Sequence, residues 1–102
     1  EHALGLLFAA ARWIPQAHAS LTRDRQWDRK RFMGVQLRGK VLGVVGLGRI
    51  GSEVARRARA LGMRVLAYDP FIGPERAEEL GVELRELEAL FPEVDMLTLH
   101  TP

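Results

Sequence analysis

Apolar and polar positions follow two different patterns along the chain, and the pattern changes near residue 40. Residues 1–22 place apolar side chains at three- and four-residue steps and are apolar on more than one side. We therefore expect an N-terminal helix over 1–22 that is buried on two faces. Pro15 lacks a backbone N–H and should kink this helix or divide it. Residues 23–39 are polar and basic, which predicts a connector with little regular structure.

Residues 40–102 alternate short apolar runs with amphipathic segments. Short apolar runs are typical of strands buried on both faces, and amphipathic segments are typical of helices that cover a sheet. Alternation at these lengths favours parallel pairing through right-handed crossovers, so we expect an α/β fold with a parallel sheet of three to four strands. We expect strands at 40–46, 63–69, 82–84 and 94–102, and helices at 49–61, 74–81 and 85–91.

Composition narrows the classes of protein that the chain can belong to. No run approaches the roughly 18–20 apolar residues that span a bilayer, so we expect no membrane partner. The chain has no cysteine, which excludes disulfides, thiolate nucleophiles and cysteine metal sites and is compatible with the cytoplasm, the location we expect. It begins at Glu1 without a basic leader, and we expect it to start inside a longer parent or after processing.

The charge is small overall, at +2, but unevenly distributed. Basic residues gather between Arg23 and Lys40, and acidic residues between Glu75 and Asp95. Such asymmetry sometimes marks a nucleic-acid surface. The basic segment contains only two aromatic residues, Trp27 and Phe32, and it has no recognition-helix signature. We therefore expect a solvated linker or a docking surface and no nucleic acid as partner.

Three glycines stand in the stretch "VVGLGRIGSEVARRARALGMRVLAYD", residues 44–69, where an expected strand passes into an expected helix. Gly46 permits a tight turn, Gly48 lets the backbone approach a pyrophosphate, and Gly51 lets the helix pack close to the strands. The helix N-terminus, at about Arg49 and Ile50, offers free N–H groups and partial positive charge to phosphates. The Arg49 side chain can add a charge-assisted contact.

Asp69 follows Gly51 by 18 residues, at the end of the second expected strand. A carboxylate in this position accepts hydrogen bonds from the adenosine ribose and repels a 2′-phosphate. Pro70, not a basic residue, comes next, so NAD is favoured over NADP as cofactor. Two alternatives stay open from the residues alone. The glycines can serve strand–turn–helix packing without a ligand, and Asp69 can be a structural cap before Pro70.

Five segments in this order resemble the D-isomer-specific 2-hydroxyacid dehydrogenases: "EHALGLLFAAARWIPQAHASL", "WDRKRFMGVQLRGK", "GVVGLGRIG", "VLAYDPF" and "DMLTLHTP". The resemblance implies a Rossmann-type sheet with strand order 3-2-1-4. It places Arg49 and Ile50 along the pyrophosphate and Asp69 on the adenosine ribose. It makes Thr101 and Pro102 the adenine-side wall of the crevice. It gives His100 no catalytic part.

The resemblance also implies that these 102 residues do not include the catalytic residues, because the catalytic Arg, Glu and His of such enzymes lie further along the chain. We expect three parts: an N-terminal helix (1–22), a connector (23–39) and the first half of a Rossmann NAD-binding domain (40–102). We expect a partial NAD site and no activity of these residues alone. We also expect a homo-oligomer, in the form of a dimer, through helix 1–22 or the exposed edge of strand 94–102. The alternative is a non-catalytic half-Rossmann scaffold, excised or designed, without significant NAD affinity.

Overall fold

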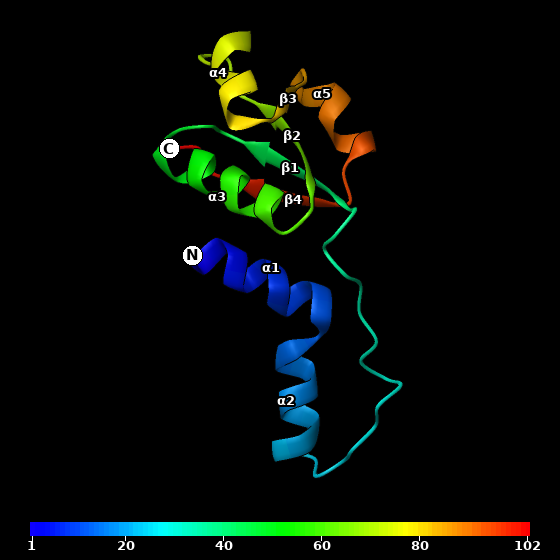
Figure 1. The fold of residues 1–102 in the computed structure, drawn as a ribbon. Helices are drawn as coiled ribbons and strands as arrows, with labels where there is room; N and C mark the ends of the chain where they lie inside the picture. The colour runs from blue at the N-terminus through cyan, green and yellow to red at the C-terminus, as the bar shows by residue number, and fades with distance from the viewer. The chain divides into compact units, whose positions relative to one another are not determined.

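The computed structural model describes all residues from 1 to 102, and they divide into two compact units at Gln36 and Leu37. The first unit holds helices α1 (His2–Arg12) and α2 (Ile14–Thr22), followed by a segment without helix or strand. The second unit holds the sheet and its helices (Figure 1). No helix of the structure has the length and apolar character needed to cross a membrane.

Helices α1 and α2 are separated at Trp13, which has the left-handed backbone angles φ 57° and ψ 33°. The sequence predicts a division caused by Pro15, and the structure places the break two residues earlier. Proline is tolerated in the first turn of a helix, where its missing N–H has no partner in any case. Pro15 accordingly lies in the first turn of α2, and the chain turns before it.

The end of the first unit returns to α1. The Val35 N–H donates to the Ala11 carbonyl at 3.0 Å. Gly34 lies so close to this turn that a side chain there would collide with the Ala11 carbonyl oxygen. This hydrogen bond fixes the end of the connector although the connector contains no helix or strand. Backbone N–H and C=O groups in a loop need hydrogen-bond partners as much as those in a helix do.

The second unit is a four-stranded parallel sheet with the strand order β3-β2-β1-β4. This confirms the predicted fold class and strand order. The two central strands are β1 (Val41–Val45) and β2 (Arg64–Tyr68), and the edges are β3 (Glu83–Leu84) and β4 (Met96–Leu99). Every predicted strand is present, and each is shorter than predicted.

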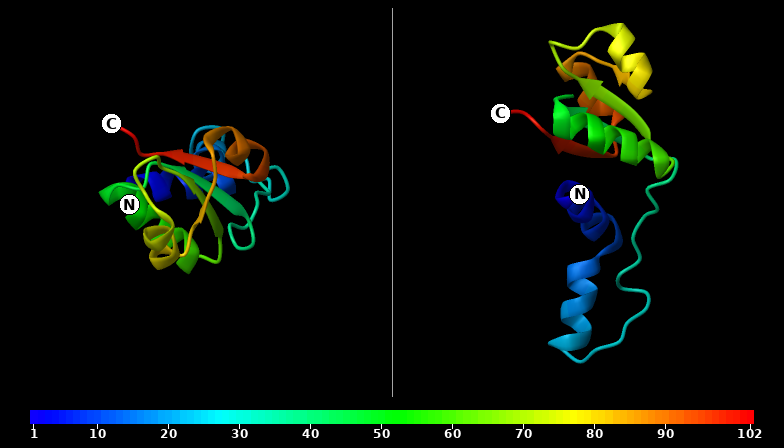
Figure 2. Two further views of the ribbon diagram at one scale, coloured as in Figure 1. Left: turned by 90° about the horizontal axis from the view of Figure 1, so that it is seen from above. Right: turned by 60° about the vertical axis from the view of Figure 1, so that its left-hand side comes forward.

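Helices cover both faces of this sheet (Figure 2). The long helix α3 (Arg49–Ala60) connects β1 with β2, and α4 (Pro74–Leu80) connects β2 with β3. The short α5 (Leu87–Leu90) and the 3₁₀ helix η1 (Phe91–Glu93) precede β4 on the other face. Burial on both faces explains why the strands read as continuous apolar runs. The largest of the fully buried core side chains are Leu42, Val44, Val65, Leu66 and Leu90.

The two edges of the sheet differ in character. At the β3 edge, Glu83 forms ion pairs with Arg64 at 2.6 Å and with Arg85 at 3.4 Å, so the edge is short and charged. The Arg64 hydrogen bond, with Arg85 as a lesser cause, lowers the pKa of Glu83 to about 2. At the β4 edge, Leu97 and Leu99 are exposed and no strand pairs on the outer side. Charged short edges resist further pairing, whereas apolar open edges favour it.

Candidate functional site

The glycine-containing loop follows β1 at the carboxyl ends of the strands, where ligands of open parallel sheets bind. Gly46 has a positive φ of 97°, and a Cβ there would lie 2.5 Å from the carbonyl oxygen of His100. Gly51 packs against Gly46, and a Cβ on it would collide with the Gly46 carbonyl oxygen. These two glycines are required by the fold, as predicted, whether or not a ligand is bound.

Gly48 differs from its two neighbours. It precedes the first turn of α3 with φ −72° and ψ −156°, an extended conformation open to any residue. A Cβ on Gly48 would meet no protein atom within 4 Å. Neither backbone strain nor packing therefore requires glycine here. Space left free at a helix N-terminus suits the close approach of a phosphate to backbone N–H groups.

Asp69 connects the end of β2 to this loop. One carboxylate oxygen, Oδ2, accepts the Leu47 N–H at 2.7 Å, and the other, Oδ1, accepts the Phe71 N–H at 2.8 Å. The structural cap that the sequence left open is therefore present. Each oxygen of a carboxylate accepts about two hydrogen bonds, so acceptor capacity for ribose hydroxyls remains.

A pocket of about 360 Å³ opens beside Asp69 between the ends of β1, β2 and β4. Of the predicted site residues, the structure brings six together along it: Gly46, Gly48, Asp69, Pro70, Thr101 and Pro102. The other three, Arg49, Ile50 and Gly51, lie in the first turn of α3 outside the lining. Three residues that also line the pocket were not singled out as site residues in the sequence: Val45, Tyr68 and Phe71. His100, to which the resemblance gives no catalytic part, lines it as well.

Phe71 is the most exposed of these, with 93% of its surface accessible to solvent. Its backbone is fixed by the bond to Asp69 and by the preceding proline. An aromatic residue two positions after the expected ribose ligand was the one available signal in the sequence. His100 is held at the strand end, where its Nε2 lies 2.8 Å from Thr98 Oγ1.

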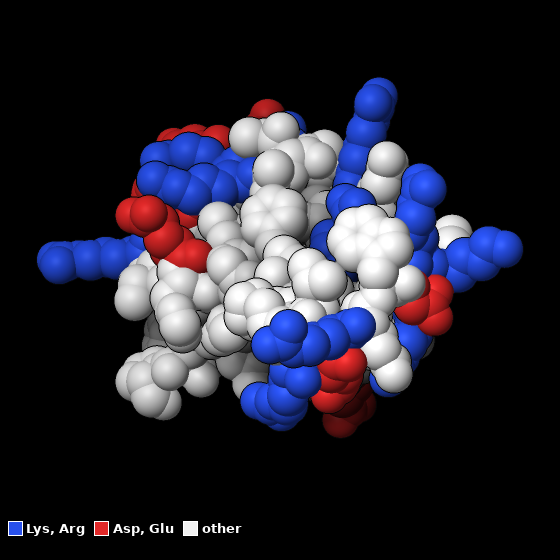
Figure 3. Space-filling model, turned by 90° about the horizontal axis from the view of Figure 1, so that it is seen from below, with Lys and Arg blue, Asp and Glu red and all other residues white.

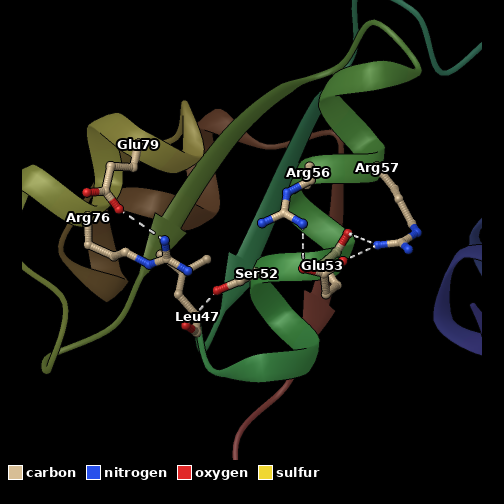
Figure 4. A network of polar contacts seen from close by, with 7 residues as sticks. All are labelled: Leu47, Ser52, Glu53, Arg56, Arg57, Arg76 and Glu79. Atoms are coloured by element: carbon tan, nitrogen blue, oxygen red, sulfur yellow. Dashed lines mark hydrogen bonds and ion pairs between the residues drawn. The ribbon is translucent and has the colours of Figure 1, made fainter.

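Arg49 is the basic side chain available to an anion at the start of α3. Figure 4 shows that Arg56 and Arg57, further along the helix, are both paired with Glu53, at 2.7 and 2.6 Å. The Arg57 hydrogen bond, with the charges of both arginines, holds the pKa of Glu53 below its usual value. Arg49 lies one turn before Glu53, is exposed and forms no ion pair.

Residues 4–102 match the family described as "D-isomer specific 2-hydroxyacid dehydrogenase, NAD binding domain". The chain belongs to this family. NAD is the cofactor that the family's description prints, and the residues around Gly48 and Asp69 fit it, because they leave room for a pyrophosphate beside an anion-binding helix end and a hydroxyl-binding carboxylate. The resemblance to this family in the sequence is thereby confirmed.

Within the family the motifs resemble D-3-phosphoglycerate dehydrogenases most, which the relatives confirm. The chain is 55% identical over 102 residues to D-3-phosphoglycerate dehydrogenase of Archaeoglobus fulgidus, covering all of this chain and 19% of the relative. It is 49% identical over the same length to the Homo sapiens enzyme of that name, again covering 19% of it. The chain thus spans about a fifth of the length of these relatives.

Solved structures agree in fold. The D-lactate dehydrogenase of Escherichia coli, without ligands, superposes with a TM-score of 0.88 at 40% identity, over 99% of this chain and 31% of that one. The D-lactate dehydrogenase of Aquifex aeolicus, complexed with NAD and lactic acid, superposes with a TM-score of 0.88 at 30% identity, over 99% of this chain and 30% of that one.

Proposed function

We propose that residues 40–102 form the first half of a Rossmann domain and hold the adenosine and pyrophosphate part of NAD. The observation that carries this proposal is the free space at Gly48, which neither φ nor packing explains. The pyrophosphate lies along the N-terminus of α3 beside Arg49 and Ile50, where free N–H groups and the helix dipole favour an anion.

The adenosine end occupies the pocket between β2 and β4. Asp69 accepts hydrogen bonds from the ribose hydroxyls, and Pro70, Thr101 and Pro102 form the walls beside the adenine. Apolar walls with a few directional polar groups are typical of cofactor pockets. The carboxylate of Asp69 repels a 2′-phosphate, so NAD is the preferred form of the cofactor.

The test is calorimetric titration of the chain with NAD and with NADP, with Asp69→Ala as control. We expect saturable NAD binding, at least tenfold weaker NADP binding, and weakened NAD binding by the variant. Absence of heat at millimolar NAD would support the alternative, a half-Rossmann scaffold without NAD affinity, excised or designed.

We further propose that this half-site serves oxidation of D-3-phosphoglycerate, the substrate printed in the names of relatives that are 49–55% identical over the whole chain. When bound, NAD supplies the hydride acceptor for a 2-hydroxyacid. Serine biosynthesis is the expected pathway, and the cytoplasm is the expected location, which cell fractionation tests.

A chimera tests the proposed substrate. In it, residues 4–102 replace the matching segment of the Archaeoglobus fulgidus enzyme. NAD-dependent turnover of D-3-phosphoglycerate must persist, and its loss in a folded chimera would contradict the proposal.

Self-association is a separate proposal, supported by apolar surface in both units. Exposed side chains in the first unit include Leu6, Ile14 and Trp27, and the open β4 edge exposes Leu99. Figure 3, seen from the side of α2 and the connector, shows uncharged side chains gathered in the middle with Lys and Arg around them. Exposed apolar side chains such as Leu6, Ile14 and Leu99 favour association where they form a patch. We expect a dimer, and light scattering that shows a monomer at micromolar concentration would contradict it.

A further inference from the structure

Leu47, between the first two glycines of the loop, is held through both of its backbone polar groups. Its N–H donates to Asp69 Oδ2 at 2.7 Å, and its carbonyl accepts the Ser52 hydroxyl at 2.9 Å. Figure 4 shows the second of these bonds, from the first turns of α3 back to the loop. The Leu47 side chain is itself buried, with 2% of its surface exposed. The loop is thus fixed on one side by β2 and on the other by α3.

Ser52 is one of two buried polar residues of the chain, with 5% of its surface exposed. Its backbone N–H donates to the Gly48 carbonyl at 3.0 Å, the ordinary first bond of the helix. Its hydroxyl does something additional, because it reaches back five residues to a carbonyl that lies outside the helix. Neither the glycine spacing nor the acidic residue at the strand end accounts for a hydroxyl at this position.

We propose that Ser52 and Asp69 form a clamp on Leu47, defined by these two hydrogen bonds, that holds the glycine loop in its phosphate-binding shape before a ligand arrives. Ser52 is then a positioning residue for the pyrophosphate. The proposal rests on the NAD half-site described above and deepens it. Its physical basis is preorganisation, since a loop ordered in advance does not lose that conformational entropy on binding.

The clamp gives Asp69 two roles that a substitution of Asp69 cannot separate. One role is toward the ribose, and the other is toward the loop through Leu47. Asp69→Ala removes both at once, so weakened NAD binding in that variant does not identify which role was lost. Ser52→Ala removes one arm of the clamp and leaves every ribose contact in place. Ser52→Thr keeps the hydroxyl and is the matched control.

The experiment compares wild type, Ser52→Ala and Ser52→Thr in binding to ADP-ribose, which has the pyrophosphate, and to adenosine, which has none. A net hydrogen bond is worth about a fivefold change in a binding constant. We expect Ser52→Ala to weaken ADP-ribose about fivefold and to leave adenosine unchanged within about twofold. Ser52→Thr should restore ADP-ribose binding. Amide exchange at Leu47 and Gly48, measured by NMR, should be faster in Ser52→Ala alone.

Three outcomes would count against the clamp or its basis. Equal ADP-ribose binding by wild type and Ser52→Ala overturns the clamp and leaves the NAD half-site standing. Equal weakening of both ligands also overturns it, because a general loss of structure does not discriminate between them. If wild type binds neither NAD nor ADP-ribose, the half-site fails and the positioning role fails with it.

Discussion

Gly48 and Gly51 stand three residues apart in one motif, and the structure assigns them opposite kinds of importance. A Cβ on Gly51 would collide with the Gly46 carbonyl oxygen and lie 2.9 Å from its carbon. A Cβ on Gly48 would meet nothing. We therefore predict that Gly51→Ala lowers stability and that Gly48→Ala lowers affinity for the cofactor.

The magnitudes follow from the surroundings of each glycine. Overpacking against other atoms costs about 1–3 kcal/mol, and here the obstacle is rigid backbone, so we take about 3 kcal/mol for Gly51→Ala. Alanine regains about 1 kcal/mol of helix propensity, which leaves a net loss of about 2 kcal/mol. For a chain of this size that lowers Tm by about 8–16 °C.

For Gly48→Ala, the loss of a favourable cap residue costs about 0.5 kcal/mol. The stiffer unfolded chain returns a similar amount, so the free energy of unfolding should stay within about 0.5 kcal/mol of wild type. The new methyl group then lies in the space of the pyrophosphate. NAD binding should weaken at least tenfold, or by about 1.4 kcal/mol.

Thermal unfolding followed by circular dichroism measures the first effect, and NAD titration of each folded variant measures the second. Each variant is the control of the other. A Gly48→Ala protein that melts as early as Gly51→Ala would refute the reasoning, as would a Gly48→Ala protein that binds NAD like wild type.

Three further predictions concern other parts of the second unit. Glu83→Gln should lower the free energy of unfolding by under about 1 kcal/mol at pH 7, because the paired side chains are half exposed. Since Arg64 lowers the pKa of Glu83 from 4.5 to about 2, this contribution is complete above pH 4.5 and lost as the pH falls through 2; a difference in urea unfolding that persists below pH 2 would contradict it. Phe71→Ala should leave Tm unchanged and weaken adenosine about tenfold in an NMR titration, as loss of a stacking surface does; unaltered adenosine affinity would exclude such contact. Leu99→Lys should reduce the apparent mass in light scattering without changing the circular dichroism spectrum, and an unchanged mass would remove the β4 edge from the proposed interface.

The strands of the sheet could be predicted from the sequence because a strand that is buried on both faces appears as a continuous run of apolar residues. The run "KVLGVVG" and the glycine that ends it indicate β1 and its turn without any knowledge of distant residues. The break between α1 and α2 could not be placed, because tryptophan has no preference for the left-handed conformation that Trp13 adopts. Pro15 therefore indicated that the helix divides in this region, but it did not indicate that the break lies at Trp13.

The site was predictable in part for the same reason. Glycines at fixed spacing and an acid at a strand end are local features. The hydrogen bond from the Leu47 N–H to Asp69 joins residues that are 22 positions apart. No pattern of residue types in the sequence predicts it. Likewise His100 lines the pocket only because β4 lies beside β1, which is a property of the topology and not of its neighbours in sequence.

The position of β4 ties cofactor binding to folding. β4 pairs with β1 alone, and the bond from the Val41 N–H to Asp95 Oδ2 joins residues 54 apart, so this strand is the most distant in sequence to join the sheet. Distant pairings close the largest loops, and strands with one neighbour open most easily. Yet Thr101 and Pro102 reach the pocket only when β4 is docked. A ligand that contacts them therefore stabilises the last strand, and part of its binding free energy is used to complete the fold.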